Sequence, residues 1–375
     1  MDSKSLIVII LTLSIGLIFS CDTTSSNSDF QQCKSDNSLG SITNRNFDMG
    51  FSTWSYGPDQ SDVDDTYQFI SQNADIYSEQ IDEYIPWSAW INNSSLPSEF
   101  EDIVQSKVAK KLPNQKLLLS VSLLNTDRSD LLSDYDGTIP SYNSLNDQKI
   151  EEAYFKHLDY LISELEPDYL VVAMEVNELL IKSESKWNEY KILMDNIRGR
   201  LKSAYPTLPL SESMTLHNWF NPEVPDPSAF ISEISSYINQ NLDYAAISFY
   251  PFFKGLRTKS DFQQPFDFLH NQTTQSIAFV ETTHLAEDLT VEAFDVNIPS
   301  NACEQKDYLE ELLNNAYNKN YEFVIWWAHR DYDELWATFP DEVKDIGKLW
   351  RDTGLLDEDG NQRPAYKTWK SVLNR

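Results

Sequence analysis

The chain is poor in the residues and motifs that mark several common kinds of functional site. Only 10 of its 375 residues are glycine, and neither GxGxxG nor GxSxG occurs in it. The first absence argues against a dinucleotide-binding turn, and the second against the serine nucleophile of an α/β-hydrolase. Its 5 histidines are scattered and form no HExxH pattern. The sequence therefore predicts neither a cofactor nor a metal site.

Basic residues are also few. The chain has 29 lysines and arginines against 59 aspartates and glutamates, which gives a formal net charge of -30. Binding to nucleic acid needs a basic face that neutralises phosphates, so the charge argues against nucleic acid as a partner and disfavours a strongly anionic polysaccharide. A solvated acidic surface also resists aggregation, and we expect a monomer.

The start of the chain has the pattern of a secretory signal. Lys4 precedes an apolar stretch from Leu6 to Phe19 that is too short to span a membrane comfortably. The string Ile18-Phe19-Ser20-Cys21 resembles a bacterial lipobox, and this resemblance implies a lipid on Cys21. We expect an exported lipoprotein, periplasmic or at the cell surface, that meets the membrane only through its lipid; simple secretion and an uncleaved anchor are the alternatives.

The predicted organisation is a signal peptide over residues 1–20, a flexible polar tether over 21–40 and one domain over 41–375. Cys33 and Cys303 are the two cysteines left for the exported protein. They could form a disulfide that pins the start of the chain to the domain, and two free thiols are equally compatible with the sequence.

Apolar runs of strand length alternate with segments of helical period over most of the chain. The predicted strands are Phe47–Trp54, Ala74–Glu79, Lys116–Leu124, Tyr169–Met174, Leu208–Met214, Tyr244–Phe249, Ser276–Glu281 and Glu322–Trp327. The predicted helices are Val63–Asn73, Ser98–Lys111, Asp147–Leu165, Ser185–Ala204, Pro227–Gln240, Lys259–His270, Cys303–Asn318 and Pro340–Asp352. Eight such units predict an α/β fold, a (β/α)₈ TIM barrel; a doubly wound open sheet is the second choice, but it usually has a glycine-rich first turn.

Two glutamates stand at the ends of predicted strands, where a barrel places its chemistry. Asn177-Glu178 follows the fourth strand, and Glu281 ends the seventh. Paired carboxyl groups suit cleavage of a glycosidic bond, because one gives a proton to the leaving oxygen while the other attacks or stabilises the cationic centre. Strand alternation makes Glu175 a rival to Glu178, because Glu178 faces the other way unless the strand ends before it. Capping of helices or pairing with surface lysines is the alternative role for Glu178 and Glu281.

These strand ends resemble those of the large clan of retaining glycoside hydrolases with (β/α)₈ barrels. In that clan strand 4 ends in Asn-Glu and strand 7 in Glu, so the resemblance implies that Glu178 is the acid/base, Glu281 the nucleophile and Asn177 a ligand of the sugar 2-hydroxyl. It also implies that Tyr250 hydrogen-bonds the nucleophile and that Trp327 floors the subsite at the cleaved bond. Gly354 to Trp369 resembles the turn and final helix that close many such barrels.

The residues at the ends of two strands make the resemblance to a particular family more specific. Ser248-Phe-Tyr-Pro251 and Val280-Glu-Thr282 are closest to endo-β-1,4-galactanases. Strands 1 and 3 do not reproduce that family's pattern, and the end of strand 2 has no arginine. The reaction class is therefore better defined than the sugar or the linkage.

Aromatic residues near strand ends are the candidates for a substrate groove, because flat rings stack on sugar faces. We expect Trp54, Trp87 and Trp327 to contact substrate, and His217 and His284 to hydrogen-bond sugar hydroxyls; each could equally be a packing residue. The sequence thus predicts a retaining, endo-acting glycoside hydrolase that cleaves a neutral polysaccharide or oligosaccharide. The alternative is a catalytically silent glycan-binding lipoprotein on the same barrel.

Overall fold

A computed structural model describes Cys33 and residues 38–375. The predicted signal peptide, Cys21 and most of the predicted tether lie outside the described residues. No helix in the described part of the chain is long and apolar enough to cross a membrane.

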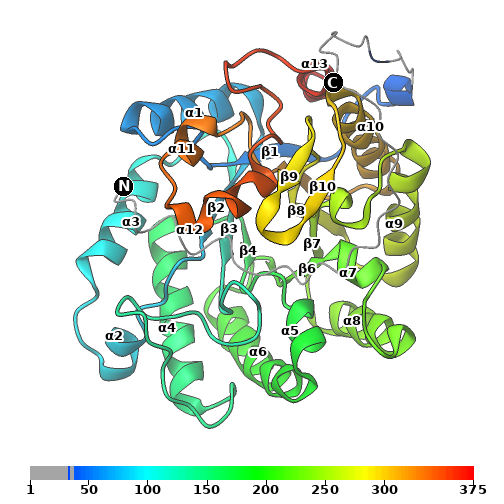
Figure 1. The fold of residues 1–375 in the computed structure, drawn as a ribbon. Helices are drawn as coiled ribbons and strands as arrows, with labels where there is room; N and C mark the ends of the chain where they lie inside the picture. Colours follow the sequence, from blue (N-terminus) through cyan, green and yellow to red (C-terminus); the bar gives the residue numbers. More distant parts are fainter. Residues whose placement is uncertain (1–32, 34–37) are drawn as a thin grey trace.

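The centre of the molecule is a barrel of parallel strands surrounded by helices (Figure 1). The strands of its sheet are β1 Asp48–Ser52, β2 Ile76–Ile81, β3 Lys116–Val121, β4 Tyr169–Val171, β5 Leu210–Ser211, β6 Ser213–Thr215, β7 Ala245–Phe249, β8 Ile277–Thr282 and β11 Phe323–Trp326. Their order is β5-β4-β3-β2-β1-β11-β8-β7-β6. Because β5 and β6 are two parts of one strand interrupted at Glu212, this order closes the barrel and confirms the predicted (β/α)₈ fold and its eight strands.

The helices that cover the barrel follow the strands in the predicted alternation. The longer ones are α1 Gln60–Asn73, α3 Ser98–Ala109, α4 Gln148–Leu165, α6 Glu184–Ala204, α8 Pro227–Asn241, α9 Lys259–Gln272, α10 Ala302–Lys319 and α13 Pro364–Leu373. Polar caps begin several of them, because a side-chain oxygen can accept from the free N–H groups of the first turn. Asp147 caps α4, Asp226 caps α8 and Asn301 caps α10.

Shorter elements occupy the loops. They are the helices α2 Trp87–Asn92, α5 Asn177–Lys182, α7 Leu216–Phe220, α11 Asp333–Ala337 and α12 Asp341–Lys344, the 3₁₀ turns Ser38–Ser41, Pro251–Lys254, Glu292–Phe294 and Ile346–Trp350, and the hairpin of β9 Leu289–Val291 with β10 Val296–Ile298. The hairpin was not predicted. The predicted helix Pro340–Asp352 is also wrong: it forms α12 and a 3₁₀ turn, and Gly347 there packs so closely on Phe339 that a Cβ would lie 2.7 Å from its ring. The eighth helix of the barrel is α13.

An aromatic layer lies at the carboxyl ends of the strands, on top of the barrel interior. Tyr250, Phe252 and Tyr332 pack there against the β9–β10 hairpin and the segment Phe339 to Leu349, with Trp54 at the edge. The barrel interior below is filled by aliphatic and small side chains such as Leu118, Ala246 and Val280, together with Tyr244 and Phe323. The carboxyl ends of the strands are therefore surrounded by packed aromatic side chains.

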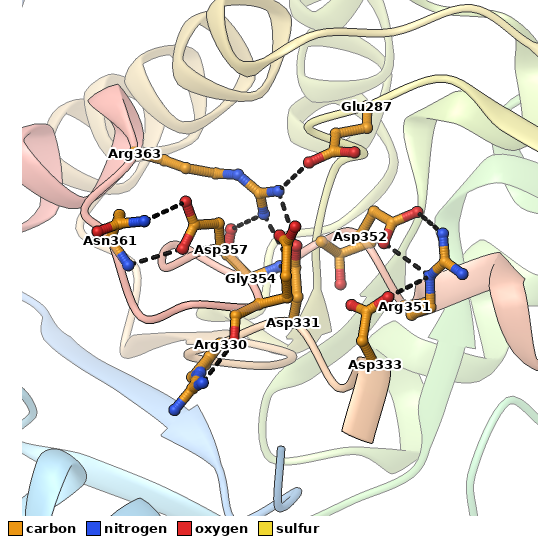
Figure 2. A network of polar contacts seen from close by, with 12 residues as sticks. Glu287, Arg330, Asp331, Asp333, Arg351, Asp352, Gly354, Asp357, Asn361 and Arg363 are labelled. Atoms are coloured by element: carbon orange, nitrogen blue, oxygen red, sulfur yellow. Dashed lines mark hydrogen bonds and ion pairs between the residues drawn. The ribbon is translucent and has the colours of Figure 1, made fainter. Parts of the chain in front are cut away.

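A polar network fastens the C-terminal segment to the loop after β11 (Figure 2). Asp331 accepts hydrogen bonds from the Gly354 N–H at 2.8 Å and from Arg363 at 2.7 Å, and Arg363 also pairs with Glu287 at 2.6 Å. Only glycine fits at 354, because a Cβ there would lie 2.4 Å from the Asp331 nitrogen. The loop that begins with Trp327 is thereby held in place by a residue 36 positions further along the chain.

A disulfide joins Cys33 to Cys303 at the start of α10. Leu39 and Ile42 are buried in the main hydrophobic core, and Arg375 donates to their carbonyl groups. The turn Ser38–Ser41 and Ile42 therefore pack onto the rest of the described domain.

Loss of this disulfide should destabilise the domain. Cys33→Ser with Cys303→Ser should lower the free energy of unfolding by about 2–4 kcal/mol, because the bond restricts the unfolded chain. Urea unfolding of the variant and of the oxidised wild type measures the difference. Equal midpoints would show that the bond contributes nothing.

Candidate active site

Glu281 lies at the carboxyl end of β8 and points into the mouth of the barrel because the strand is irregular there. Opposite β7, Ile247 pairs with Phe279 while the next residue, Ser248, pairs with Glu281, so Val280 is an extra residue on β8. Bulges of this kind re-aim side chains next to active sites. The Val280 side chain lies in the barrel interior. Because of the bulge, the Glu281 side chain points to the same side of the sheet.

Two neutral donors hold the Glu281 carboxyl group. The Tyr250 hydroxyl donates to Oε1, as the sequence predicted for this pair, and the Gln80 side-chain amide donates to Oε2. Glu281 is only 9% exposed. Burial and the nearby charge of Glu175 raise its pKa to about 8, against the opposing hydrogen bond from Gln80.

Glu175 is the carboxyl group that lies next to Glu281. Its backbone is in the left-handed region, with φ of 55°, which ends the extended chain after β4. Arg128 donates to Oε2 from Nε at 3.3 Å and from Nη2 at 2.9 Å, and the Ser248 hydroxyl donates to Oε1 at 2.7 Å. Burial works to raise the pKa of Glu175, but the charge of Arg128 and these hydrogen bonds outweigh it and leave the pKa below its ordinary value.

Glu178 occupies a different position, in the first turn of α5. Its Oε1 accepts from the Thr215 hydroxyl and from the Asn218 amide, the latter at 2.8 Å. Burial raises its pKa. Glu175 is hydrogen-bonded to Ser248, which pairs with Glu281 across β7 and β8, whereas Glu178 is hydrogen-bonded to Thr215 and Asn218. Because β4 ends at Val171 and the chain turns at Glu175, these contacts favour Glu175, the rival, over the predicted Glu178 as the partner of Glu281.

Three predicted substrate ligands are almost completely buried. Asn177 is fully buried and exchanges hydrogen bonds with Thr215 through both ends of its amide. Trp87 is 1% exposed and donates to the Leu132 carbonyl at 2.7 Å. His284 is also 1% exposed and packs against Phe262. Each of these three side chains therefore has its surface covered by protein in the structure.

The other predicted ligands lie around the strand ends. The rings of Trp54 and Trp327 lie 5.1 Å apart, at the ends of β1 and β11. Their indole N–H groups are buried and have no hydrogen-bond partner among the described residues, and neither has Nδ1 of His217. Burial lowers the pKa of His217 to about 4, while the charge of Glu175 acts in the opposite direction. Buried polar groups normally find a partner, so these three unpaired atoms are exceptions to that rule.

Sequence reasoning missed several residues that build the site. Gln80 was placed just beyond the predicted end of its strand, Arg128 follows a loop without a recognised pattern, and Ser248 was noted only as part of a motif. Glu175 had been considered as a rival. The one signal that could have found Arg128 is its position shortly after a predicted strand end, but many polar residues share that position.

Carboxylates outside this site lie close enough together to hold a cation. The two groups are Glu287, Asp331 and Glu358, and Asp331, Asp333 and Asp352. Arg363 already pairs with Glu287 and Asp331, and Arg351 with Asp333 and Asp352. These arginines supply the positive charge that a cation would bring.

Solved structures with the same fold are glycoside hydrolases. GH5_18 of Bifidobacterium longum subsp. longum, in complex with Manβ1-4GlcNAc, superposes with a TM-score of 0.65 at 15% identity and covers 88% of this chain and 78% of its own. A GH53 catalytic domain of Ignisphaera aggregans has a TM-score of 0.54 at 16% identity, over 89% of this chain and 92% of its own. Xylanase 10B of Thermotoga maritima has a TM-score of 0.56 at 16% identity, over 88% and 95%.

No protein-family model and no curated protein matches the chain. At these identities the likeness establishes the fold, a TIM barrel of the kind that these glycoside hydrolases use.

The raised pKa of Glu281 predicts a stability cost that grows with pH. The folded state keeps the proton up to about pH 8, whereas the unfolded chain loses it near pH 4.3. Between these values stability falls as pH rises, by up to about 1.4 kcal/mol for each pH unit. Glu281→Gln removes this cost, so its gain in unfolding free energy over wild type should be larger at pH 8 than at pH 5. Urea unfolding at both pH values measures it, and an equal gain at both would contradict the raised pKa.

Proposed function

We propose that this protein is an exported, retaining glycoside hydrolase that cleaves a neutral polysaccharide. The observation that carries the proposal is the pair Glu175 and Glu281 at the mouth of a TIM barrel, where Ser248 hydrogen-bonds Glu175 and pairs with Glu281 in the sheet. Glycosidic cleavage by double displacement needs two carboxyl groups in such a position. The aromatic pair Trp54 and Trp327 beside them supports a sugar substrate, because sugar faces stack on aromatic rings.

Glu281 is the proposed nucleophile and Glu175 the proposed acid/base. In the first step an oxygen of the Glu281 carboxylate bonds to the anomeric carbon, the glycosidic C–O bond breaks and the leaving oxygen takes a proton from Glu175. In the second step Glu175 accepts a proton from water, the water oxygen bonds to the anomeric carbon and Glu281 is released. Tyr250 and Gln80, which donate to Glu281, favour the carboxylate that attacks and that leaves again.

The unpaired N–H groups of Trp54 and Trp327 and Nδ1 of His217 are proposed to meet sugar oxygens. Two of the structural neighbours have sugars bound, Manβ1-4GlcNAc in one and GlcNAc in the other, which supports a carbohydrate ligand. The net charge of -30 favours a neutral glycan over an anionic one. The Ser248 to Pro251 and Val280 to Thr282 strings make β-galactan the first polymer to test, with endo action expected.

The proposed roles can be tested by substitution. On a panel of neutral polysaccharides the wild type should release reducing ends from at least one polymer. Glu281→Gln should abolish that release, and Glu175→Gln should lower it about 10²-fold to 10⁴-fold, because a general acid contributes that much. Glu178→Gln is the matched control and should keep activity within about tenfold, because its carboxyl group only joins α5 to Thr215 and Asn218.

Two further results decide between this proposal and its rivals. Azide should restore turnover of an activated aryl glycoside by Glu175→Ala, because a small anion can attack the glycosyl-enzyme without a base. Full activity of both Glu175→Gln and Glu281→Gln would refute the pair. Glycan binding by the wild type without new reducing ends would favour a silent binding protein instead.

We also propose that the chain is a lipoprotein anchored through Cys21. Cys21→Ala should move the protein from the detergent phase to the aqueous phase in a phase-separation assay, because the lipid is the only proposed membrane contact. Mass spectrometry of the wild-type N-terminal peptide should find the lipid on Cys21. A wild type that is wholly aqueous would overturn this part of the proposal.

A further inference from the structure

Arg128 is held firmly in the mouth of the barrel. It lies in the loop between β3 and α4 with a left-handed backbone, φ of 56°. Its Nη1 donates to the Leu124 carbonyl at 3.4 Å and to the Asn125 carbonyl at 3.2 Å, so both ends of the guanidinium are engaged. The remaining N–H groups point at one oxygen of Glu175.

Arg128 is the strongest positive charge acting on Glu175. Four titratable or charged groups face Glu175, and they are Arg128 after β3, Glu178 on α5, His217 on α7 and Glu281 on β8. A fifth group, Asp82 after β2, lies further away and faces Arg128 and Glu281. His217 is buried with a pKa of about 4 and is therefore neutral near pH 7. The other three are carboxyl groups. Arg128 is thus the one fixed cation in the set.

The two members of the pair have different kinds of partner. Glu281 receives hydrogen bonds from two neutral groups, Tyr250 and Gln80. Glu175 receives a charged guanidinium and the Ser248 hydroxyl. Two buried carboxyl groups that interact in this way tend to share one proton around neutral pH, and a guanidinium that cannot lose its own proton favours the ionised form of the group it touches.

We propose that Arg128 is a positioning residue that holds Glu175 as a carboxylate, so that the shared proton resides on Glu281 until substrate binds. This inference rests on the proposed function. It assigns Arg128 to the second displacement step, in which Glu175 must be a base that takes a proton from water. For the first step, substrate binding must loosen the Arg128–Glu175 contact and move the proton from Glu281 to Glu175, which leaves Glu281 ionised to attack.

The charge state of Glu175 can be measured without any substrate. In protein labelled with ¹³C at the glutamate carboxyl carbons, the Glu175 signal is the one that disappears in Glu175→Gln. In Arg128→Gln its pKa should rise by about one to three units, the usual effect of removing a neighbouring opposite charge. Arg128→Lys keeps the charge but not the two-pronged contact, so it should give a smaller rise.

A matched control shows that the change is local. Arg257→Gln removes a different arginine–carboxylate pair, the exposed one with Glu304 at 2.5 Å, and should leave the Glu175 titration as in wild type. A melting curve for each variant confirms that it is folded. If Arg128→Gln does not fold, the titration of Arg128→Lys still tests the proposal. An unchanged pKa of Glu175 in both Arg128 variants would overturn the proposal.

Kinetics test the assignment to the second step. With an aryl glycoside whose leaving group needs little acid, the acid limb of the kcat profile should move to higher pH in Arg128→Gln by as much as the pKa of Glu175 rises, because the base is ionised only above that pKa. Both limbs of the kcat/KM profile should move to higher pH, because Arg128 also lowers the pKa of Glu281. A profile and kcat equal to wild type would contradict this role.

The titration and the kinetic experiments can give negative results independently of each other. A wild type that hydrolyses no glycan and no aryl glycoside would refute the proposed function, while the NMR titration would still decide whether Arg128 holds Glu175 ionised. An active wild type with an unmoved titration would refute the inference about Arg128 alone.

Discussion

The mutual repulsion of Glu175 and Glu281 is the constraint around which the mouth of this barrel is built. Two carboxyl groups in a site with little water cannot both ionise cheaply, and each raises the cost of charging the other. In the structure the two carboxyl groups have different kinds of hydrogen-bond partner. Arg128 brings a full positive charge to Glu175, while Tyr250 and Gln80 bring only neutral dipoles to Glu281. The difference between these partners decides where the charge and the proton reside.

Such a pair is useful only if the strands that carry it are immobile. The bulge at Val280 turns Glu281 into the mouth, and the left-handed turn at Glu175 brings its side chain to the same place. Near the split between β5 and β6, the fully buried Glu212 accepts from Arg198, Tyr190 and Tyr237. A buried charge with one missing partner is strongly destabilising, so this group ties α6 and α8 to the closing strand of the barrel.

The opposite side of the mouth is fixed from the C-terminus. Asp331 bonds the Gly354 backbone and Arg363, and the aromatic layer of Tyr250, Tyr332 and their neighbours covers the strand ends. Trp54 and Trp327 are thus held against each other with their N–H groups unpaired. A preformed surface of this kind binds a ligand without first having to order its own side chains.

The sequence by itself determined the barrel, its eight strands and the identity of Glu281, Tyr250 and Trp327 as strand-end residues. Those predictions rest on local apolar runs, and such runs are long enough to define strands covered on both faces. The sequence also offered Glu175, Asn177 and Glu178 within four residues and could not choose among them. The choice depends on where β4 stops and how the chain turns, which is set by its pairing with the split fifth strand.

The sequence could not predict the contacts of Arg128, Gln80 and Ser248 for a related reason. Each contacts a carboxyl group at least 47 positions away in the chain, and no local pattern encodes such a distance. The tertiary structure alone decided that Glu175 is the neighbour of Glu281 and that Arg128 donates hydrogen bonds to only one of the two. Closure of the barrel brings the strand ends together, and the electrostatics of the site exist only once it is closed.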